Sequence, residues 1–280
     1  YIVEEGATLH IEEGVKIIAV YDDIADYILV KQGGKINAVG TPDKPIVMTS
    51  EKEEPGAWGG IHICGRAHTN AEGGKGSSEI GGAVYGGNDD ADNSGTLQYI
   101  RLEYTGFAFD EEHEANGISF YGVGNGTIVD HCQAYKGSDD GFEFFGGSVN
   151  VSNLVAVSCS DDSFDWTEGW NGKGTNLVAY QEAESTLGYD CDCLMECDNN
   201  GSNNAATPVA HPVLKNLILV GNGGSKQGIR LRAGTEVEID NAKVCGKGQP
   251  LTVETALTEN ALKNGTSKLT NITLTSELSC

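Results

Sequence analysis

The sequence predicts an all-β chain that folds as a single-stranded right-handed parallel β-helix with irregular turn insertions. Three observations predict this fold. A short apolar alternation preceded by Asn or a close substitute recurs along the chain, and a second alternating segment follows each copy. No segment shows the 3.6-residue stripe of an amphipathic helix. A strand-only unit of this length cannot bury its apolar face alone, so consecutive copies must stack and share one core.

The first strand of each unit carries the Asn. Its copies span residues 128–134, 151–157, 174–180, 214–220, 239–245 and 269–275, with a looser copy at 97–103. Asp130 serves as the substitute in the 128–134 copy, 23 residues before Asn153. Stacking then places one column of side chains along the axis, namely Asn153, Asn176, Asn216, Asn241 and Asn271. Because side-chain amides hydrogen-bond to one another and Asn tolerates the left-handed turn, we expect these residues to be structural.

The second strand of each unit predicts which side chains face the core. Its copies keep their apolar residues at one parity, as in Ile118 and Phe120, then Phe142 and Phe144. The residues between them must point outward, since strand side chains alternate. Stacking gives two outward columns: Ser119, Glu143, Asp165, Glu196, Arg230 and Thr252, and then Tyr121, Phe145, Thr167, Asp198, Arg232 and Glu254.

Acidic residues concentrate on three successive turns. Further acids precede the central ones, at Asp139 and Asp140, Asp161 and Asp162, and Asp192. Like charges stacked one strand apart, about 4.8 Å, repel each other, so something should compensate them. One candidate is Ca²⁺, which prefers carboxylate oxygens and tolerates irregular geometry. The predicted metal ligands are Asp139, Asp140, Glu143, Asp161, Asp162, Asp165, Asp192 and Glu196.

Two alternatives to a metal stay open at this point. The Arg230 and Arg232 pair lies one turn further along and can neutralise the acids. The acids can also lie in solvated turns and accept backbone N–H groups, as Asp often does.

Bulk composition narrows the partners and the compartment. The 280 residues carry a net charge of -23, which disfavours nucleic acid and anionic membranes. No apolar run is long enough to span a bilayer. Eight cysteines in even number favour disulfides, including at Cys191, Cys193 and Cys197, and hence an oxidising compartment. We expect one domain over residues 1–280, trimmed at one or both ends.

The order of several short motifs resembles that of a known family. These motifs lie at 33–36 (GGKI), 40–46 (GTPDKPI), 58–61 (WGGI), 87–90 (GNDD), 93–97 (NSGTL), 100–104 (IRLEY), 116–118 (NGI), 122–127 (GVGNGT), 139–147 (DDGFEFFGG) and 161–165 (DDSFD). The chain from Tyr1 to about Asn200 is similar to the secreted right-handed β-helix proteins of Bacteroidetes and related bacteria. The resemblance implies a pectate-lyase-like superhelix and export to the periplasm or cell surface, without an established activity.

Three functions are compatible with this pattern. The first is an exported, cation-stabilised scaffold that binds glycans or surface proteins, with Tyr121, Phe145, Trp170, Asp198 and Arg232 as possible ligand contacts. The second is a polysaccharide lyase or glycoside hydrolase, in which Asp161, Asp165, Glu196 and Arg230 would supply metal ligands, acid and base. The third is end-to-end self-association into a filament or surface layer through exposed strand edges.

Overall fold

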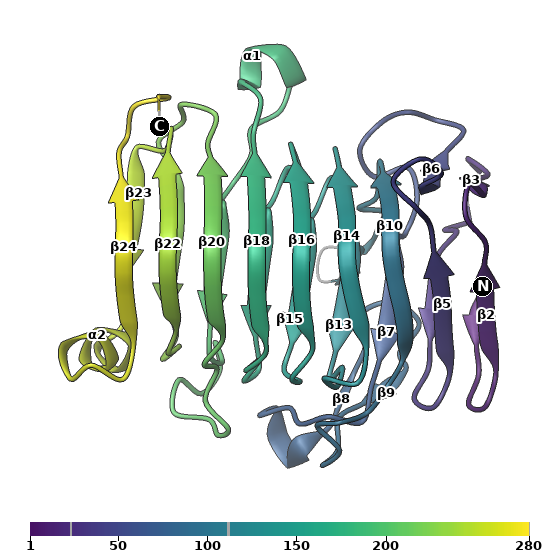
Figure 1. Ribbon diagram of the computed structural model, residues 1–280, viewed down its shortest axis with the longest axis horizontal. Coiled ribbons are helices and arrows are strands. Elements are labelled where there is room, and N and C mark those ends of the chain that lie inside the picture. Colours follow the sequence, from purple (N-terminus) through teal and green to yellow (C-terminus); the bar gives the residue numbers. More distant parts are fainter. Residues whose placement is uncertain (23, 111–112, 280) are drawn as a thin grey trace.

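The computed structural model describes residues 1–22, 24–110 and 113–279. Two long parallel sheets, here called sheet A and sheet B, run along the molecule (Figure 1). Each turn of the chain adds one strand to each sheet, except that the first two turns add two strands to sheet B. Sheet A has nine strands: β1 (Ile2–Val3), β4 (Ile28–Val30), β7 (Ile61–Cys64), β13 (Ile118–Tyr121), β15 (Phe142–Phe145), β17 (Phe164–Thr167), β19 (Met195–Asp198), β21 (Gln227–Arg232) and β23 (Gln249–Val253).

Sheet B contains the strands that carry the Asn residues. Its eleven strands are β2 (Thr8–Ile11), β3 (Lys16–Ala19), β5 (Lys35–Val39), β6 (Ile46–Ser50), β10 (Gly95–Glu103), β14 (Ile128–Tyr135), β16 (Asn150–Val157), β18 (Lys173–Tyr180), β20 (Val213–Val220), β22 (Glu238–Cys245) and β24 (Lys268–Leu274). The predicted parallel β-helix is therefore confirmed.

Irregular insertions leave the coil at several turns, as predicted. The longest, here called the 66–93 insertion, holds the short 3-10 helix Glu72–Gly74 and the hairpin β8 (Gly76–Ser77) with β9 (Val84–Tyr85). A second hairpin pairs β11 (Ala108–Asp110) with β12 (His113–Glu114). The two α-helices, α1 (Glu184–Leu187) and α2 (Ala256–Lys263), lie at opposite edges of the coil (Figure 1). No described helix is long and apolar enough to cross a membrane.

The core consists of stacked apolar side chains that fill the inside of the coil. The predicted inward residues of sheet A pair in register, from Ile118 with Phe142 and Phe142 with Phe164 onward to Ile229 with Leu251. Their rings stack, with 4.9 Å between the centroids of Phe120 and Phe144. The alternation of apolar residues thus predicted the register of this sheet to the residue.

The Asn column forms a hydrogen-bonded ladder along sheet B. The side-chain Nδ2 of Asn176 donates to Asn153 Oδ1 (2.9 Å), Asn216 donates to Asn176 (3.1 Å) and Asn241 donates to Asn216 (2.8 Å). Each of these residues has a positive φ. Asn271 departs from the expectation, because its amide donates to Asp240 Oδ1 instead.

The prediction that Asp130 occupies the Asn position is wrong by one residue. His131 lies at this position in the left-handed conformation, and Tyr99 does so one turn earlier. Asp130 pairs in register with Ser152 and accepts hydrogen bonds from Ser152 Oγ and Asn153 Nδ2. The aromatic rings of Tyr99 and His131 stack in place of the amides, with 4.5 Å between their centroids.

The prediction of disulfides is wrong for most of the cysteines. Six cysteines have free thiols, namely Cys64, Cys132, Cys159, Cys191, Cys193 and Cys197. All six are buried, and four of them, Cys64, Cys132, Cys159 and Cys197, pack as small apolar residues. They therefore carry no information about an oxidising compartment.

Candidate metal centre

Three carboxylates form a row on the outer surface of sheet A. Glu143 on β15 pairs in register with Asp165 on β17, which pairs with Glu196 on β19. They point away from the core because Phe142, Phe164 and Met195, the residues before them, point inward. The predicted outward column is confirmed, and it continues through Ser119 to His62 on β7.

Two further acids, Asp140 and Asp162, lie in the turns that lead into β15 and β17. Each is nearly buried, with 5% and 4% of its surface exposed. Asp140 Oδ1 accepts the backbone N–H of Asp162 (2.9 Å), and Asp162 Oδ1 accepts that of Cys193 (2.6 Å). Asn116 Oδ1 begins this series by accepting the N–H of Asp140 (3.2 Å). The capping part of the turn alternative is thus correct for one oxygen of each Asp, but its expectation of solvated turns is wrong, because both side chains are buried.

The turn acids and the row acids come together in two overlapping groups. Carboxylate oxygens of Asp140, Glu143 and Asp165 lie within 4.8 Å of one another, and so do those of Asp162, Asp165 and Glu196. Asp165 belongs to both groups. The same arrangement therefore repeats one turn further along the coil.

The two arginines neutralise only one end of the row. Arg230 contacts Glu196 (3.0 Å) and Glu254 (2.9 Å), while Arg232 contacts Asp198 (2.7 Å) and the other oxygen of Glu196. The arginine alternative is therefore correct for Glu196 and Asp198. It does not extend to the preceding turns.

The remaining carboxyls lie in an environment that opposes their charge. Burial, followed by repulsion from neighbouring carboxylates, raises the pKa values of Asp140, Glu143, Asp162 and Asp165 well above their ordinary range. Among the described residues, no lysine or arginine forms an ion pair with these four acids. Glu143 does accept a hydrogen bond from Asn116 Nδ2 (2.5 Å). These groups must either take up protons or bind a cation.

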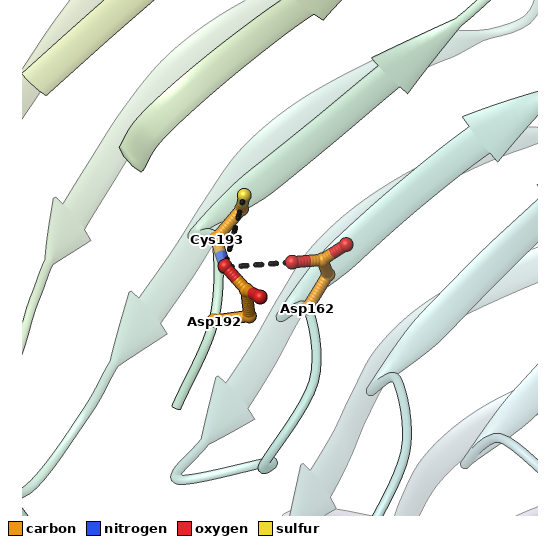
Figure 2. Close-up of side chains that lie close together, drawn as sticks. All are labelled: Asp162, Asp192 and Cys193. Carbon is orange, nitrogen blue, oxygen red and sulfur yellow. Dashed lines mark hydrogen bonds between the residues drawn. The ribbon is translucent and has the colours of Figure 1, made fainter. Parts of the chain in front are cut away.

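A third group contains a thiol. Figure 2 shows Asp162, Asp192 and Cys193 side by side, and their ligand atoms lie within 4.8 Å of one another. The Cys193 thiol donates to Asp192 Oδ1 (3.5 Å), and the Lys226 ammonium contacts Asp192 Oδ2 (2.8 Å). Because Lys226 already compensates Asp192, this predicted ligand is the least available to a metal.

A fourth group lies beside the first and includes Asp139, Asp140 and Asp161. Burial, with repulsion from Asp161 and from Glu114 and Glu79, raises the pKa of Asp139 to about 8. Each of the eight predicted metal ligands thus belongs to at least one of four neighbouring groups. Of the predicted catalytic residues, Asp165 and Glu196 share one group beside Arg230, whereas Asp161 belongs to the Asp139 group.

The predicted ring platforms for sugars are not available, and this expectation is wrong. Tyr121 and Phe145 point outward from the coil, but they are 1% and 8% exposed. The 66–93 insertion covers them with Ala83 and Tyr85. Trp170 is 1% exposed and stacks on Phe144 inside the core. Of the other two predicted ligand contacts, Arg232 is partly exposed, whereas Asp198 is buried, and the two bind each other.

Sequence reasoning missed two residues that shape the site. Asn116 orients both Glu143 and Asp140, and Glu79 reaches the site from the 66–93 insertion. Tyr121 Oη donates to Glu79 Oε2 (3.4 Å), and burial raises the pKa of Glu79 to about 7. Asn116 lies one turn before Asp140, so aligning the repeats places it in the same column of turn residues as Asp140. No repeat signal marks Glu79, because insertions do not follow the period.

The family model described as "Pectate-lyase like beta helix domain" matches residues 1–279. The chain belongs to this family. Among solved structures, this pectate-lyase-like β-helix is similar to the catalytic domain of a GH87 alpha-1,3-glucanase variant in complex with tetrasaccharides, with a TM-score of 0.30 and 10% sequence identity. The match covers 95% of this chain and 62% of the glucanase chain. No curated protein matches this chain.

Proposed function

We propose that this protein is an exported β-helix scaffold whose acidic row binds Ca²⁺. The observation that carries the proposal is the position of Asp165, which lies within 4.8 Å of two sets of carboxylate oxygens at once. A cation at either group would supply the positive charge that Asp140, Glu143, Asp162 and Asp165 lack. Burial makes this substitution favourable, because an uncompensated carboxylate in a low-dielectric site is costly.

The donor set fits a hard cation. The two groups that share Asp165 offer carboxylate oxygens only, and Ca²⁺ accepts several such ligands in irregular geometry. When bound, the ion would supply charge neutralisation and hold successive turns together. Asp140, Glu143 and Asp165 would hold one ion, and Asp162, Asp165 and Glu196 the other.

The role that follows is structural. The row joins the turns that carry β15, β17 and β19, and Arg230 and Arg232 continue the same charge compensation into β21. Family membership supports a polysaccharide as the partner of the exposed faces and an extracellular location for the scaffold. Affinity electrophoresis in gels containing single polysaccharides, with and without Ca²⁺, tests the glycan part separately.

We do not extend the proposal to catalysis. A lyase would need Arg230 as a free base, but Arg230 donates to both Glu254 and Glu196. The hydrogen bond to Glu254 is the main cause that raises the pKa of its guanidinium. Such a group does not accept a proton.

Calorimetric titration with Ca²⁺ and thermal unfolding in Ca²⁺ or EDTA test the cation site. We expect wild-type protein to bind the ion and to unfold at a higher temperature in its presence, as mass action requires. Asp165→Asn should remove both effects. Asp43→Asn, at an exposed turn, is the matched control and should retain both. If wild-type protein unfolds at the same temperature in Ca²⁺ and in EDTA, the proposal is contradicted.

A further inference from the structure

Lys247 is a lysine without exposed surface in the turn after β22. Its Nζ contacts three neutral oxygens: Cys191 O (3.0 Å), Gln181 Oε1 (3.1 Å) and Asn222 Oδ1 (3.2 Å). Burial lowers the pKa of this amine, although nearby acids oppose the shift. A buried lysine of this kind has more of the neutral, nucleophilic form than an exposed one.

Asn222 lies in the turn after β20, one turn of the coil before Lys247. Its side-chain Nδ2 donates to Asp190 Oδ1 at 2.7 Å. One amide group therefore has an amine at its oxygen end and a carboxylate at its nitrogen end. This arrangement places a nucleophile, an acyl group and a proton carrier in contact.

We propose that Lys247 and Asn222 form an intramolecular isopeptide bond, with Asp190 as the proton carrier. The neutral Nζ attacks Cγ of Asn222, so that a new C–N bond forms and the Cγ–Nδ2 bond breaks. The Asp190 carboxylate takes the proton released by Nζ and delivers it to Nδ2, which leaves as ammonia. The reaction balances without an oxidant or a cofactor.

The neighbouring residues decide which amide reacts. Gln181 also contacts Nζ, but its Nε2 donates to the backbone carbonyl of Asp192 (3.0 Å), which cannot carry a proton. Asn222 is thus the amide with a carboxylate at its leaving group. Gly221 leaves the space for the lysine stem, because a Cβ there would lie 2.3 Å from Lys247 Cδ. The bond would join the turns after β20 and β22 covalently.

Intact mass spectrometry of the folded, then denatured and reduced, full chain tests this bond. We expect wild-type protein to be lighter than its sequence mass by one ammonia, and digestion to yield one branched peptide that contains Lys247 and Asn222. Lys247→Met and Asn222→Ala should have their full sequence masses. Lys226→Met, which removes a partly exposed lysine nearby, should still show the loss.

Asp190→Ala keeps the test decisive if the Lys247 variant fails to fold, because Asp190 is exposed. We expect this variant to fold, as circular dichroism will show, and to form the bond at least tenfold more slowly. Wild-type protein at its full sequence mass would overturn the proposal. A branched peptide that joins Lys247 to Gln181 would also overturn it, as would an Asp190→Ala protein that loses ammonia at the wild-type rate.

Discussion

Asp140 Oδ1 accepts the backbone N–H of Asp162 at 2.9 Å, so one turn acid holds the next one in place one turn further along the coil. The hydrogen bonds that order the coil therefore also gather its negative charges. This coupling between backbone order and carboxylate repulsion underlies the expected response of the protein to pH and to cations.

Without a cation, the protein should lose stability as the pH rises. Burial raises the pKa of Asp139 to about 8 and that of Glu79 to about 7, and raises those of Asp140, Glu143, Asp162 and Asp165. An acid whose pKa is raised by folding binds more protons in the folded state, so it favours folding below its unfolded pKa. That contribution disappears as the pH rises from about 4, the ordinary value, through the folded pKa values.

Urea unfolding at a series of pH values between about 4 and about 8, in EDTA and in Ca²⁺, measures this loss of stability. We expect the midpoint in EDTA to fall with rising pH and the midpoint in Ca²⁺ to fall less. A midpoint in EDTA that rises across the same range would show that the row is charged and compensated without a cation.

Arg232→Ala should destabilise the protein by about 2 kcal/mol, because it leaves the mostly buried Asp198 without its basic partner and removes one of the two arginines that contact Glu196. Arg232 contacts Asp198 and Glu196, whose side chains are 13% and 16% exposed. Chemical denaturation measures the change. Lys263→Ala breaks an exposed pair with Glu259 within one helix and should cost no more than about 0.5 kcal/mol. Equal losses of stability in Arg232→Ala and Lys263→Ala would contradict the conclusion that Arg232 compensates mostly buried carboxylates.

Phe145→Ala should destabilise the fold by about 3 kcal/mol and loosen the 66–93 insertion. The Phe145 ring stacks on Tyr121, with 4.4 Å between centroids, beneath Ala83 and Tyr85. Limited proteolysis should therefore cut the variant within residues 66–93 faster than the wild type. Phe109→Ala, at a half-exposed ring, is the control and should leave that cleavage rate unchanged.

Asn216→Ala should cost about 2 kcal/mol, because it removes two ladder hydrogen bonds and because alanine, unlike asparagine, has no polar side chain to stabilise the left-handed conformation. Asn216 has φ 60° and joins Asn176 to Asn241 through its side-chain amide. Asn216→Gly loses the same hydrogen bonds without the backbone strain. We expect the glycine variant to be more stable than the alanine variant by about 1 kcal/mol. Reversed stabilities would argue against strain at this position.

The repeating part of this protein could be predicted because the direction of each side chain depends on the alternation within its own strand. Strand alternation places Phe142 inward and Glu143 outward wherever the strand pairs, and the repeat aligns Glu143 with Asp165 and Glu196. The error at Asp130 has the same origin, since one residue of misalignment is hard to detect where Asp130 stands directly before His131 in β14.

The sequence by itself determined the parallel coil, the register of sheet A and the row of acids on its surface, because all three follow from a period of side-chain types. Only the tertiary structure decided which acids have basic partners, that the 66–93 insertion buries Tyr121 and Phe145, and that Lys247 meets Asn222. These contacts join segments of unequal length that follow no period. Their geometry depends on how each insertion packs against the coil, and alternation does not encode that packing.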